Sequence, residues 1–362
     1  MRQRYWPFHR TARALGRWVL AVVCGLGLSG LAQEDAIARP GAAANGSPSR
    51  TPGHEGLGTQ QADFGMVLKA QGGSFRNIAA TVTVPADWPN QQRVRVVRED
   101  LPRGATVNDK RIDDDVGRQL EVKIPWLAAE DEVRAVITFE VELLAPPPLP
   151  QDPGQLTIPD RRKLDRKVKR HLDPSPKIES GHPQVRQAAE EAVGERAGAW
   201  DQVQAIHAWV FTNIQFAGGF ENVQTCMQTL ERRRGVCAEK NSLAVAMLRA
   251  SGFPARLIRI PGHCYYEVYL LDGDGKGHWV GGDASTLPQI TPRGVAEGMI
   301  LQKGDNVSVI DPQTGKRTTG RFLAETATGM PQSQAARLLL QPISPALTAA
   351  PRTPAAANPG RQ

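Results

Sequence analysis

The spacing of apolar residues changes along this 362-residue chain, and a proline-rich segment marks the change. From residue 62 to residue 144, apolar and polar residues alternate in short runs separated by turns rich in Gly, Pro, Asn and Asp, a pattern typical of strands. The clearest runs cover residues 78–84, 92–98, 119–124 and 133–143. We therefore predict a small antiparallel β-sandwich over residues 61–145.

Prolines interrupt regular structure over residues 146–159, because each one fixes φ and removes a backbone donor. We predict that this segment links two domains. Beyond it, residues 183–193 and 200–214 have helical patterns, and another helix begins at Cys237 and ends before Gly252, a residue suited to a left-handed C-terminal cap. The second of these helices should bury one apolar stripe, formed by Val203, Ile206, Val210 and Ile214.

Strand patterns follow the helices at residues 254–261, 263–271 and 278–283, with a hairpin turn at 272–277. Helices followed by a sheet predict an α+β domain, which we assign to residues 160–340. Weaker strand patterns at 306–310 and 320–323 are expected to extend this sheet.

The first 32 residues have the pattern of a secretory signal peptide. Five arginines and no acidic residue precede the apolar run that starts at Trp18, and small residues end at Ala32. Cys24 lies in the apolar run and is interpreted as part of the signal. We expect export to the periplasm or the extracellular space, with no stable membrane insertion after cleavage; an uncleaved N-terminal anchor is the alternative. Residues 33–60 are predicted to form a flexible spacer, and residues 341–362 a disordered tail.

Removal of residues 1–32 lowers the formal net charge from +7 to +2, so nucleic-acid binding is not expected. A basic run remains at residues 161–170, which we interpret as a solvated helix face, with contact to an acidic partner or envelope polymer as the alternative. The three remaining cysteines, Cys226, Cys237 and Cys264, are an odd number, which disfavours a disulfide scaffold. The sequence leaves the oligomeric state open.

Cys237 is the candidate nucleophile because it follows a glycine turn and opens a helix. Unpaired N–H groups and the positive end of the helix dipole favour a thiolate at such a position. A cysteine nucleophile needs a base, and the base needs an orienting group. His263 begins one strand and Asp283 ends the next strand after a hairpin, so their side chains can meet.

These residues resemble the transglutaminase-like superfamily of papain-type folds over roughly residues 160 to 290. The fragments that carry the resemblance are Ala208-Trp209-Val210, Gly235-Val-Cys237-Ala-Glu, Pro254-Ala-Arg256, His263-Cys-Tyr-Tyr-Glu267-Val, Trp279 and Asp283-Ala-Ser. The resemblance implies that Cys237 is the nucleophile, His263 the base and Asp283 the group that orients it. His-Cys-Tyr stands here where the family has His-Ala-Trp, and Asp-Ala-Ser where it has Asp-Pro-Thr, which puts substrate preference in question.

Other polar residues receive more ordinary interpretations. The backbone N–H of Cys237 is the expected first oxyanion donor, and Gln215 and Gln228 are candidates for the second. Cys226 is expected to be buried and inert, and Cys264 to be a bystander, because successive strand residues point to opposite faces. The remaining lone histidines, His207 and His278, are expected to be nonfunctional.

We expect no metal or cofactor. A zinc site built from Cys226, Cys237, His263 and Cys264 is disfavoured because His263 and Cys264 point to opposite faces of a strand. The loop at Asp272 and Asp274 is too short to bind calcium.

We therefore expect a cysteine-dependent enzyme that acts on amide bonds of peptides or proteins through a thioester, as a transamidase, peptidase or deamidase. One alternative is a binding or assembly protein of the cell envelope that keeps the fold without turnover. Another is an adhesion or polymer-binding module that uses the sandwich and the basic run.

Overall fold

The computed structural model describes residues 56–345 except 114, 146–148, 150–151, 218–222, 292–294, 296–297 and 311–316. The predicted signal peptide, most of the predicted spacer and most of the predicted tail lie outside the described residues. All of the described residues fall within one compact unit. Among the described residues, no helix is both long enough and apolar enough to cross a membrane.

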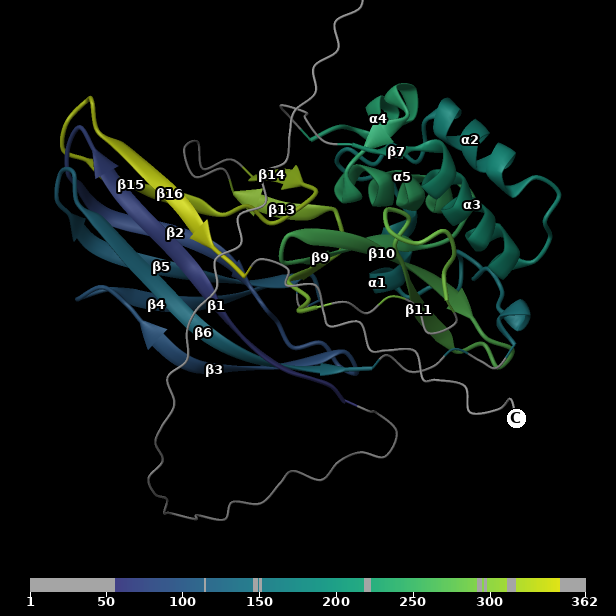
Figure 1. Cartoon of the computed structure of the whole chain (residues 1–362), viewed down its shortest axis with the longest axis horizontal. Helices are drawn as coiled ribbons and strands as arrows, with labels where there is room; N and C mark the ends of the chain where they lie inside the picture. Colours follow the sequence, from purple (N-terminus) through teal and green to yellow (C-terminus); the bar gives the residue numbers. More distant parts are fainter. Residues whose placement is uncertain are drawn as a thin grey trace, which may run out of the picture. The chain divides into compact units, whose positions relative to one another are not determined.

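Two antiparallel sheets form the strand-rich part of this unit (Figure 1). The first sheet has the order β16-β1-β6-β3, with β1 at Gly56–Gln71, β3 at Gln92–Asp100, β6 at Glu132–Leu144 and β16 at Arg337–Ile343. The second sheet contributes β2 (Phe75–Val84), β4 (Thr106–Ile112), β5 (Gly117–Leu127) and β15 (Thr326–Pro331). Alternate side chains such as Phe64, Val82 and Phe139 fill the core between the sheets, which confirms the predicted sandwich.

The limits of the sandwich differ from the prediction at both ends. Strand β1 begins at Gly56, so residues 56–60 of the predicted spacer belong to it. Strands β15 and β16, from the C-terminal end of the described chain, complete the two sheets, and β16 pairs with β1 from Gly65↔Ile343 to Gln71↔Arg337. Neither strand was predicted, and residues 341–343 of the predicted tail belong to β16.

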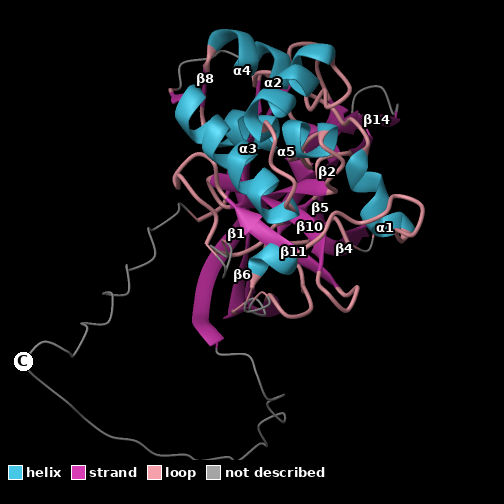
Figure 2. Cartoon of the chain, turned by 90° about the vertical axis from the view of Figure 1, so that its right-hand side faces the viewer, coloured by secondary structure: helices cyan, strands magenta, loops and turns pink. Residues whose placement is uncertain are grey.

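The helices surround a central one, α5 (Cys237–Ala250), whose side chains are buried over most of its length. It contacts α2 (Pro183–Val193), α3 (Ala199–Asn213), α4 (Cys226–Arg232) and the sheet beneath, and Figure 2 shows this group of helices. The apolar stripe of α3 is buried as predicted, and Gly252 has a φ of 88° just after α5. Short turns occur at η1 (Pro153–Gln155), α1 (Arg166–Lys169) and η2 (Arg170–Leu172). Of the basic run 161–170, only residues 166–169 form an α-helical turn, and most of the run is exposed.

Under the helices lie β9 (Ala255–Ile260), β10 (His263–Leu271) and β11 (Gly277–Gly282), as predicted. The two-residue strand β12 (Gln302–Lys303) joins β9 to β5, so one eight-stranded sheet runs from the helix-rich part into the sandwich. Thr157 of the predicted linker also pairs with Leu271 of β10.

The weaker strand patterns do not extend this sheet, contrary to the prediction. Strand β13 (Val307–Ile310) pairs with β14 (Arg317–Gly320) as a separate hairpin, and the second pattern is a strand only before residue 321. The strand that does extend the sheet, β12, has only two residues, which is too short to produce a recognisable alternation.

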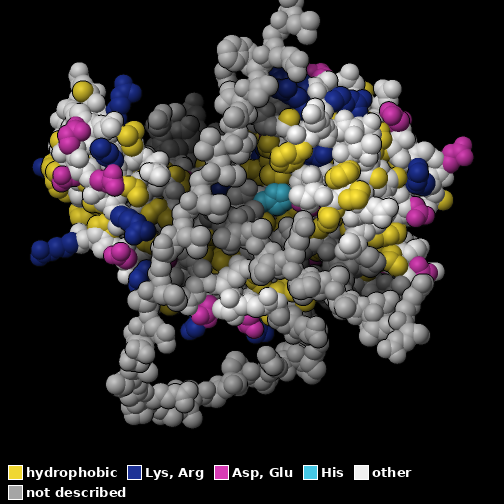
Figure 3. Space-filling model, in the orientation of Figure 1, with side chains coloured by type: hydrophobic (Ala, Val, Ile, Leu, Met, Phe, Trp, Pro, Cys, Tyr) yellow, Lys and Arg dark blue, Asp and Glu magenta, His cyan; other side chains and the backbone are white. Residues whose placement is uncertain are grey.

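On the face shown in Figure 3, basic and acidic side chains are interspersed over both the strand-rich and the helix-rich parts. Neither sign of charge dominates that face.

Candidate active site

The segment before Cys237 turns sharply into α5 because Gly235 has no side chain. A Cβ atom on Gly235 would lie 2.6 Å from the Cβ of Glu239, closer than packed atoms allow. Val236 is extended, and its N–H donates to the Glu239 carboxylate at 3.1 Å. Cys237 is therefore the first residue of the helix, where its N–H has no partner within the helix.

His263 and Asp283 meet at the end of the β10–β11 hairpin. Tyr266 pairs with Gly282 across the two strands, so Asp283 comes next to the first residues of β10. The Nε2 atom of His263 lies 2.8 Å from Oδ2 of Asp283. The hairpin packs closely here, since a Cβ on Gly282 would lie 2.6 Å from the Tyr266 ring.

Asp283 is completely buried and accepts several hydrogen bonds. Besides His263, its donors are Asn241 Nδ2 at 2.9 Å, the Ser285 N–H at 2.9 Å, the Ser285 hydroxyl and the Thr286 hydroxyl at 2.8 Å. Burial disfavours the carboxylate, but the hydrogen bonds from His263, Ser285 and Asn241 outweigh burial and hold the pKa of Asp283 below its usual range. Asp283 therefore stays negative and oriented toward His263.

His263 connects this carboxylate to Cys237. Its Nε2 faces Asp283, so Nδ1 is the nitrogen left to face the Cys237 sulfur. Burial disfavours the imidazolium, but the hydrogen bonds to Asp283 and Cys237 raise the pKa of His263 to about 10. The structure thus brings together all three residues that the sequence indicated.

Cys237 is half-buried and carries a strongly acidic thiol. A hydrogen bond from the side chain of Cys264 is the largest cause, and with the hydrogen bond and charge of His263 it lowers the pKa of Cys237 to about 4 although burial acts in the opposite direction. Between these two pKa values, a thiolate faces an imidazolium.

Cys264 is not the bystander that strand alternation predicted. Hydrogen bonding from its side chain and from its backbone lowers the pKa of Cys237. Alternation places Cys264 on the same side of β10 as Tyr266, which packs in the core shared with α5. His263 reaches the same sulfur because it is the first residue of the strand, where the backbone turns. The contact with the Cys237 thiolate, followed by burial, raises the pKa of Cys264 well above its usual value.

Asn241 is a second residue that the sequence reasoning missed. It lies one turn after Cys237 on α5 and is completely buried. Its Nδ2 donates to Asp283 and, at 3.0 Å, to the Cys264 carbonyl, while its Oδ1 accepts the Ala284 N–H at 3.0 Å. The sequence did contain a signal for this residue. Asn241 is a polar residue four positions after Cys237, on the same face of the predicted helix and just before the apolar run 243–248.

The oxyanion candidates differ in their surroundings. Gln228 forms a capping box with Thr225, whose N–H donates to the Gln228 side chain at 3.1 Å. Gln215 is exposed on β7 (Gln215–Phe216) and pairs in parallel with Arg234 of β8 (Arg234–Gly235), just before Cys237.

The other thiol and histidines have structural surroundings. Cys226 is buried at 1% exposure, as expected, and burial raises its pKa. His207 is fully buried between the Tyr266 hydroxyl at 2.7 Å and the Leu287 carbonyl at 2.8 Å. His278 bonds Asp272 at 2.6 Å and closes the hairpin.

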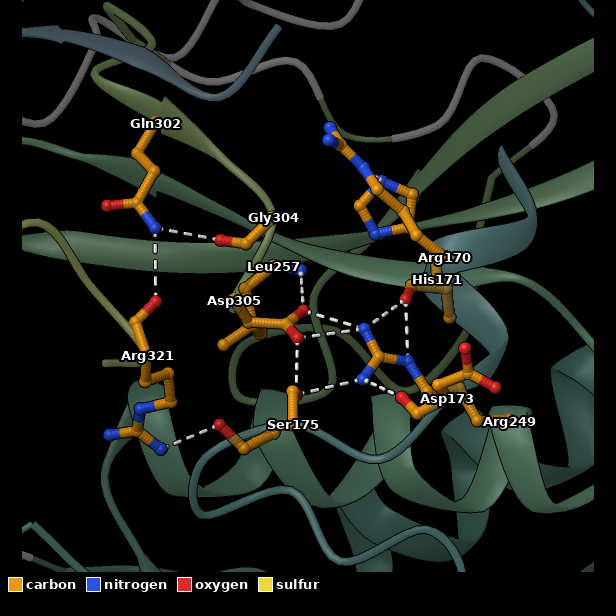
Figure 4. Close-up of polar contacts among 12 residues, drawn as sticks. Arg170, His171, Asp173, Ser175, Arg249, Leu257, Gln302, Gly304, Asp305 and Arg321 are labelled. Atoms are coloured by element: carbon orange, nitrogen blue, oxygen red, sulfur yellow. Dashed lines mark hydrogen bonds and ion pairs between the residues drawn. The ribbon is translucent and has the colours of Figure 1, made fainter. Parts of the chain in front are cut away.

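The far end of α5 is anchored by a buried ion pair. Figure 4 shows Arg249 facing Asp305, with Ser175 beside them. Arg249 Nη2 lies 2.8 and 2.9 Å from the two carboxylate oxygens, and both side chains are 1% exposed. Asp305 also accepts the Leu257 N–H of β9 at 3.1 Å. This pair connects α5 to the sheet that carries His263.

Solved structures show limited similarity to the chain. A candidate cysteine protease from Cytophaga hutchinsonii matches with 17% identity and a TM-score of 0.49, over 78% of this chain and 92% of that one. A candidate protease from Parabacteroides distasonis ATCC 8503 matches with 13% identity and a TM-score of 0.26, over 64% of this chain and 47% of that one. The present chain thus spans less than half of the second protein. No curated protein sequence matches the chain significantly.

The family comparison covers the segment that holds the site. Residues 186–284 match the family model of the transglutaminase-like superfamily. This segment begins in α2 and ends just after Asp283, so it includes α5, the β10–β11 hairpin and all three predicted site residues. The chain therefore carries a domain of the transglutaminase-like superfamily.

Proposed function

We propose that this protein cleaves amide bonds of peptides or proteins, or transfers their acyl groups to an amine, with Cys237 as the nucleophile. The observation that carries the proposal is the hydrogen bond of 2.8 Å between His263 and the buried Asp283, beside a Cys237 thiol whose pKa is lowered to about 4. The match of residues 186–284 to the transglutaminase-like superfamily supports the same chemistry.

In the first half of the reaction, the Cys237 thiolate attacks the carbonyl carbon of the amide. The backbone N–H of Cys237, at the start of α5, donates to the oxygen that becomes negative. His263 gives its proton to the nitrogen of the leaving amine, the C–N bond breaks, and a thioester to Cys237 remains. Asp283 stays ionised and keeps the imidazole in position.

In the second half, the neutral His263 takes a proton from the incoming nucleophile as that nucleophile attacks the thioester. The C–S bond breaks and Cys237 leaves as a thiolate. Water yields a carboxylic acid, which is hydrolysis of a peptide bond or deamidation of a side-chain amide. An amine yields a new amide, which is transamidation.

The test is mass spectrometry of the protein after exposure to a peptide mixture with an added primary amine. We expect acyl adducts on Cys237, together with peptide products that carry water or the amine, and none of these with Cys237→Ala. Cys226→Ala is the matched control, because it removes a buried thiol and should leave products unchanged.

The proposal fails if the wild type forms neither adducts nor products although iodoacetamide alkylates Cys237 selectively. That result would instead favour a binding protein that keeps the fold.

We also propose that the protein acts outside the cytoplasm. The basic, apolar and small-residue order of residues 1–32 supports this. Amino-terminal sequencing of the protein recovered from its producing cell should begin near residue 33; an N-terminus at Met1 would contradict cleavage.

A further inference from the structure

The loop 284–290 follows Asp283 directly and supplies part of its hydrogen bonding. The Ser285 and Thr286 hydroxyls donate to the Asp283 carboxylate at 2.6 and 2.8 Å. If the loop shifted, these two donors would move with it. The position of the loop therefore decides how firmly the carboxylate faces His263.

Apolar packing holds this loop mainly at its two ends. Ala284 and Ile290 are buried in the core that contains α5. Thr286 and residues 288–289 are exposed. The stretch that carries the donors to Asp283 thus depends on hydrogen bonds for its placement.

Helix α3 supplies such bonds through two side chains that lie one turn apart. Gln204 pairs with the backbone of Ile290, since its Nε2 donates to the Ile290 carbonyl at 2.7 Å and its Oε1 accepts the Ile290 N–H at 3.0 Å. His207 is fully buried, and its Nε2 lies 2.8 Å from the Leu287 carbonyl. The loop is therefore bonded to α3 at its middle and at its end.

The proton on His207 is placed by its two partners. A carbonyl can only accept, so Nε2 carries the proton, and Nδ1 is left to accept the Tyr266 hydroxyl at 2.7 Å. Burial lowers the pKa of His207 and so favours this neutral form. Tyr266 pairs with Gly282 in the β10–β11 hairpin. His207 thus connects the strand that begins with His263 to the loop that follows Asp283.

We propose that His207 and Gln204 are positioning residues for the reaction, because they hold the loop after Asp283 so that its carboxylate stays directed at His263. Both act through the loop rather than by contact with the reacting atoms. Their effect on turnover rests on the proposed function, whereas the placement of Asp283 does not.

Loss of this support has a measurable signature at His263. Burial disfavours the imidazolium, and the hydrogen bond to Asp283 is the largest of the contributions that raise the pKa of His263. A misplaced carboxylate should therefore lower the His263 pKa. A side chain that only fills the core should leave this pKa unchanged when it is replaced.

The test measures the His263 pKa by NMR of protein labelled with nitrogen-15 histidine, in wild type, His207→Leu, His207→Gln and Gln204→Met. Product formation from the peptide mixture with added amine is followed across pH, and circular dichroism shows which variants fold. Val203→Ala is the matched control, since Val203 is fully buried on the same helix and its replacement removes apolar contacts but no side-chain hydrogen bond to the loop.

In His207→Leu and Gln204→Met, we expect a His263 pKa about one unit lower than in the wild type and product formation lowered on the order of 10- to 100-fold. The alkaline fall of product formation should move down with the His263 pKa. His207→Gln keeps a donor for the Leu287 carbonyl and should lie closer to the wild type than His207→Leu. Val203→Ala should keep the wild-type pKa and the wild-type rate per folded molecule.

An unchanged His263 pKa in folded His207→Leu overturns the role of His207, and an unchanged pKa in Gln204→Met overturns that of Gln204. If His207→Leu does not fold, His207→Gln and Gln204→Met carry the test, and an unchanged pKa in both overturns the proposal. An equal fall in Val203→Ala also overturns it, because any loss of core packing would then lower the pKa.

The NMR titration reads the His263 proton rather than turnover. If the pKa falls in the variants but the wild type never processes an amide substrate, the proposed function fails and the positioning of Asp283 stands. If the wild type processes substrate and the pKa is unchanged in the variants, the reverse holds.

Discussion

The charge of Cys237 depends on neighbours that lie far from it in the sequence. Cys264 and His263 donate hydrogen bonds to its sulfur, and Asp283 keeps His263 protonated. A helix N-terminus favours a thiolate, but the hydrogen bonds of Cys264 and His263 dominate the shift. At the residue scale, the site is thus a thiolate and an imidazolium that stabilise each other.

These pKa values predict the pH range of the wild type. Cys237 is a thiolate above about pH 4, and His263 keeps the proton needed by a leaving amine below about pH 10. Alkylation of Cys237 should therefore rise as the pH passes 4, and amide turnover should fall as the pH passes 10.

Cys264→Ala should move the rise of alkylation to higher pH. Removal of a donor to the thiolate raises the Cys237 pKa, by about one unit if the hydrogen bond is worth about 1.5 kcal/mol. The measurement is the rate of iodoacetamide labelling against pH, with Cys226→Ala as the control. Coincident profiles for Cys264→Ala and wild type would show that the contact does not set the pKa.

Asn241→Ala should lower kcat on the order of 100-fold with little change in KM, because Asp283 and the Cys264 carbonyl lose a shared donor. Asp283 should also be held less firmly toward His263, which weakens the hydrogen bond that raises the His263 pKa, so the alkaline limb set by His263 should move to lower pH. Steady-state kinetics across pH separate this effect from mere loss of folded protein. A lower kcat with an unmoved alkaline limb would mean that Asn241 acts only on stability.

At the scale of elements, α5 links the site to the rest of the fold. Cys237 and Asn241 lie in its first two turns, and Arg249 in its last turn pairs with Asp305. Asp305 in turn accepts the Leu257 N–H of β9, the neighbour of β10. Both ends of the helix are therefore tied to the sheet that carries His263.

Arg249→Met should destabilise the protein by about 3–5 kcal/mol, because it leaves the Asp305 carboxylate buried without its partner. Adding Asp305→Leu should recover part of this loss, since the unpaired charge is then removed. Chemical denaturation followed by circular dichroism measures both changes. Arg93→Ala is the control, because Arg93 is 64% exposed in its ion pair with Glu142, and its midpoint should hardly change. If Arg249→Met and Arg93→Ala unfolded at the same denaturant concentration, the buried pair of Arg249 and Asp305 would not be needed for stability.

At the scale of the whole described chain, the sandwich and the helix-rich part share one sheet. Strand β12 connects β9 to β5, and two glutamines reinforce the junction. Gln92 is 1% exposed and bonds the backbone of Ala86 and of Ile300, while Gln91 bonds Glu267 of β10 at 2.9 Å. Separation of the two parts would expose these buried polar groups.

A fragment of residues 160–345, without the first six strands, should therefore fail to fold cooperatively. Residues 56–345 should unfold in a single calorimetric transition. The fragment should show no transition and no selective alkylation of Cys237. Two resolved transitions, or a fragment that folds and reacts with iodoacetamide, would instead support the two independent domains expected from the proline-rich segment.

Local patterns carried most of the fold prediction. Helices α2 and α3 each bury one face against the core, so their apolar spacing is visible in the sequence. Helix α5 and strands β9 and β10 are buried over most of their length and are visible as apolar runs bounded by turns. Strand β12 was missed because two residues are too few to show an alternation of apolar and polar side chains. Strands β15 and β16 were not predicted, and their pairing with β2 and β1 depends on contacts across most of the chain.

What the sequence determined by itself was the order of elements and the identities of Cys237, His263 and Asp283, because a helix start, a strand start and a hairpin end are local features. The tertiary structure decided what surrounds them. It brought Asn241 of α5 into hydrogen bonds with Cys264 and Asp283, and it placed the C-terminal strands in the sandwich. Such contacts arise from how α5 packs on the sheet. The spacing of residues along the chain does not encode which side chains this packing brings together.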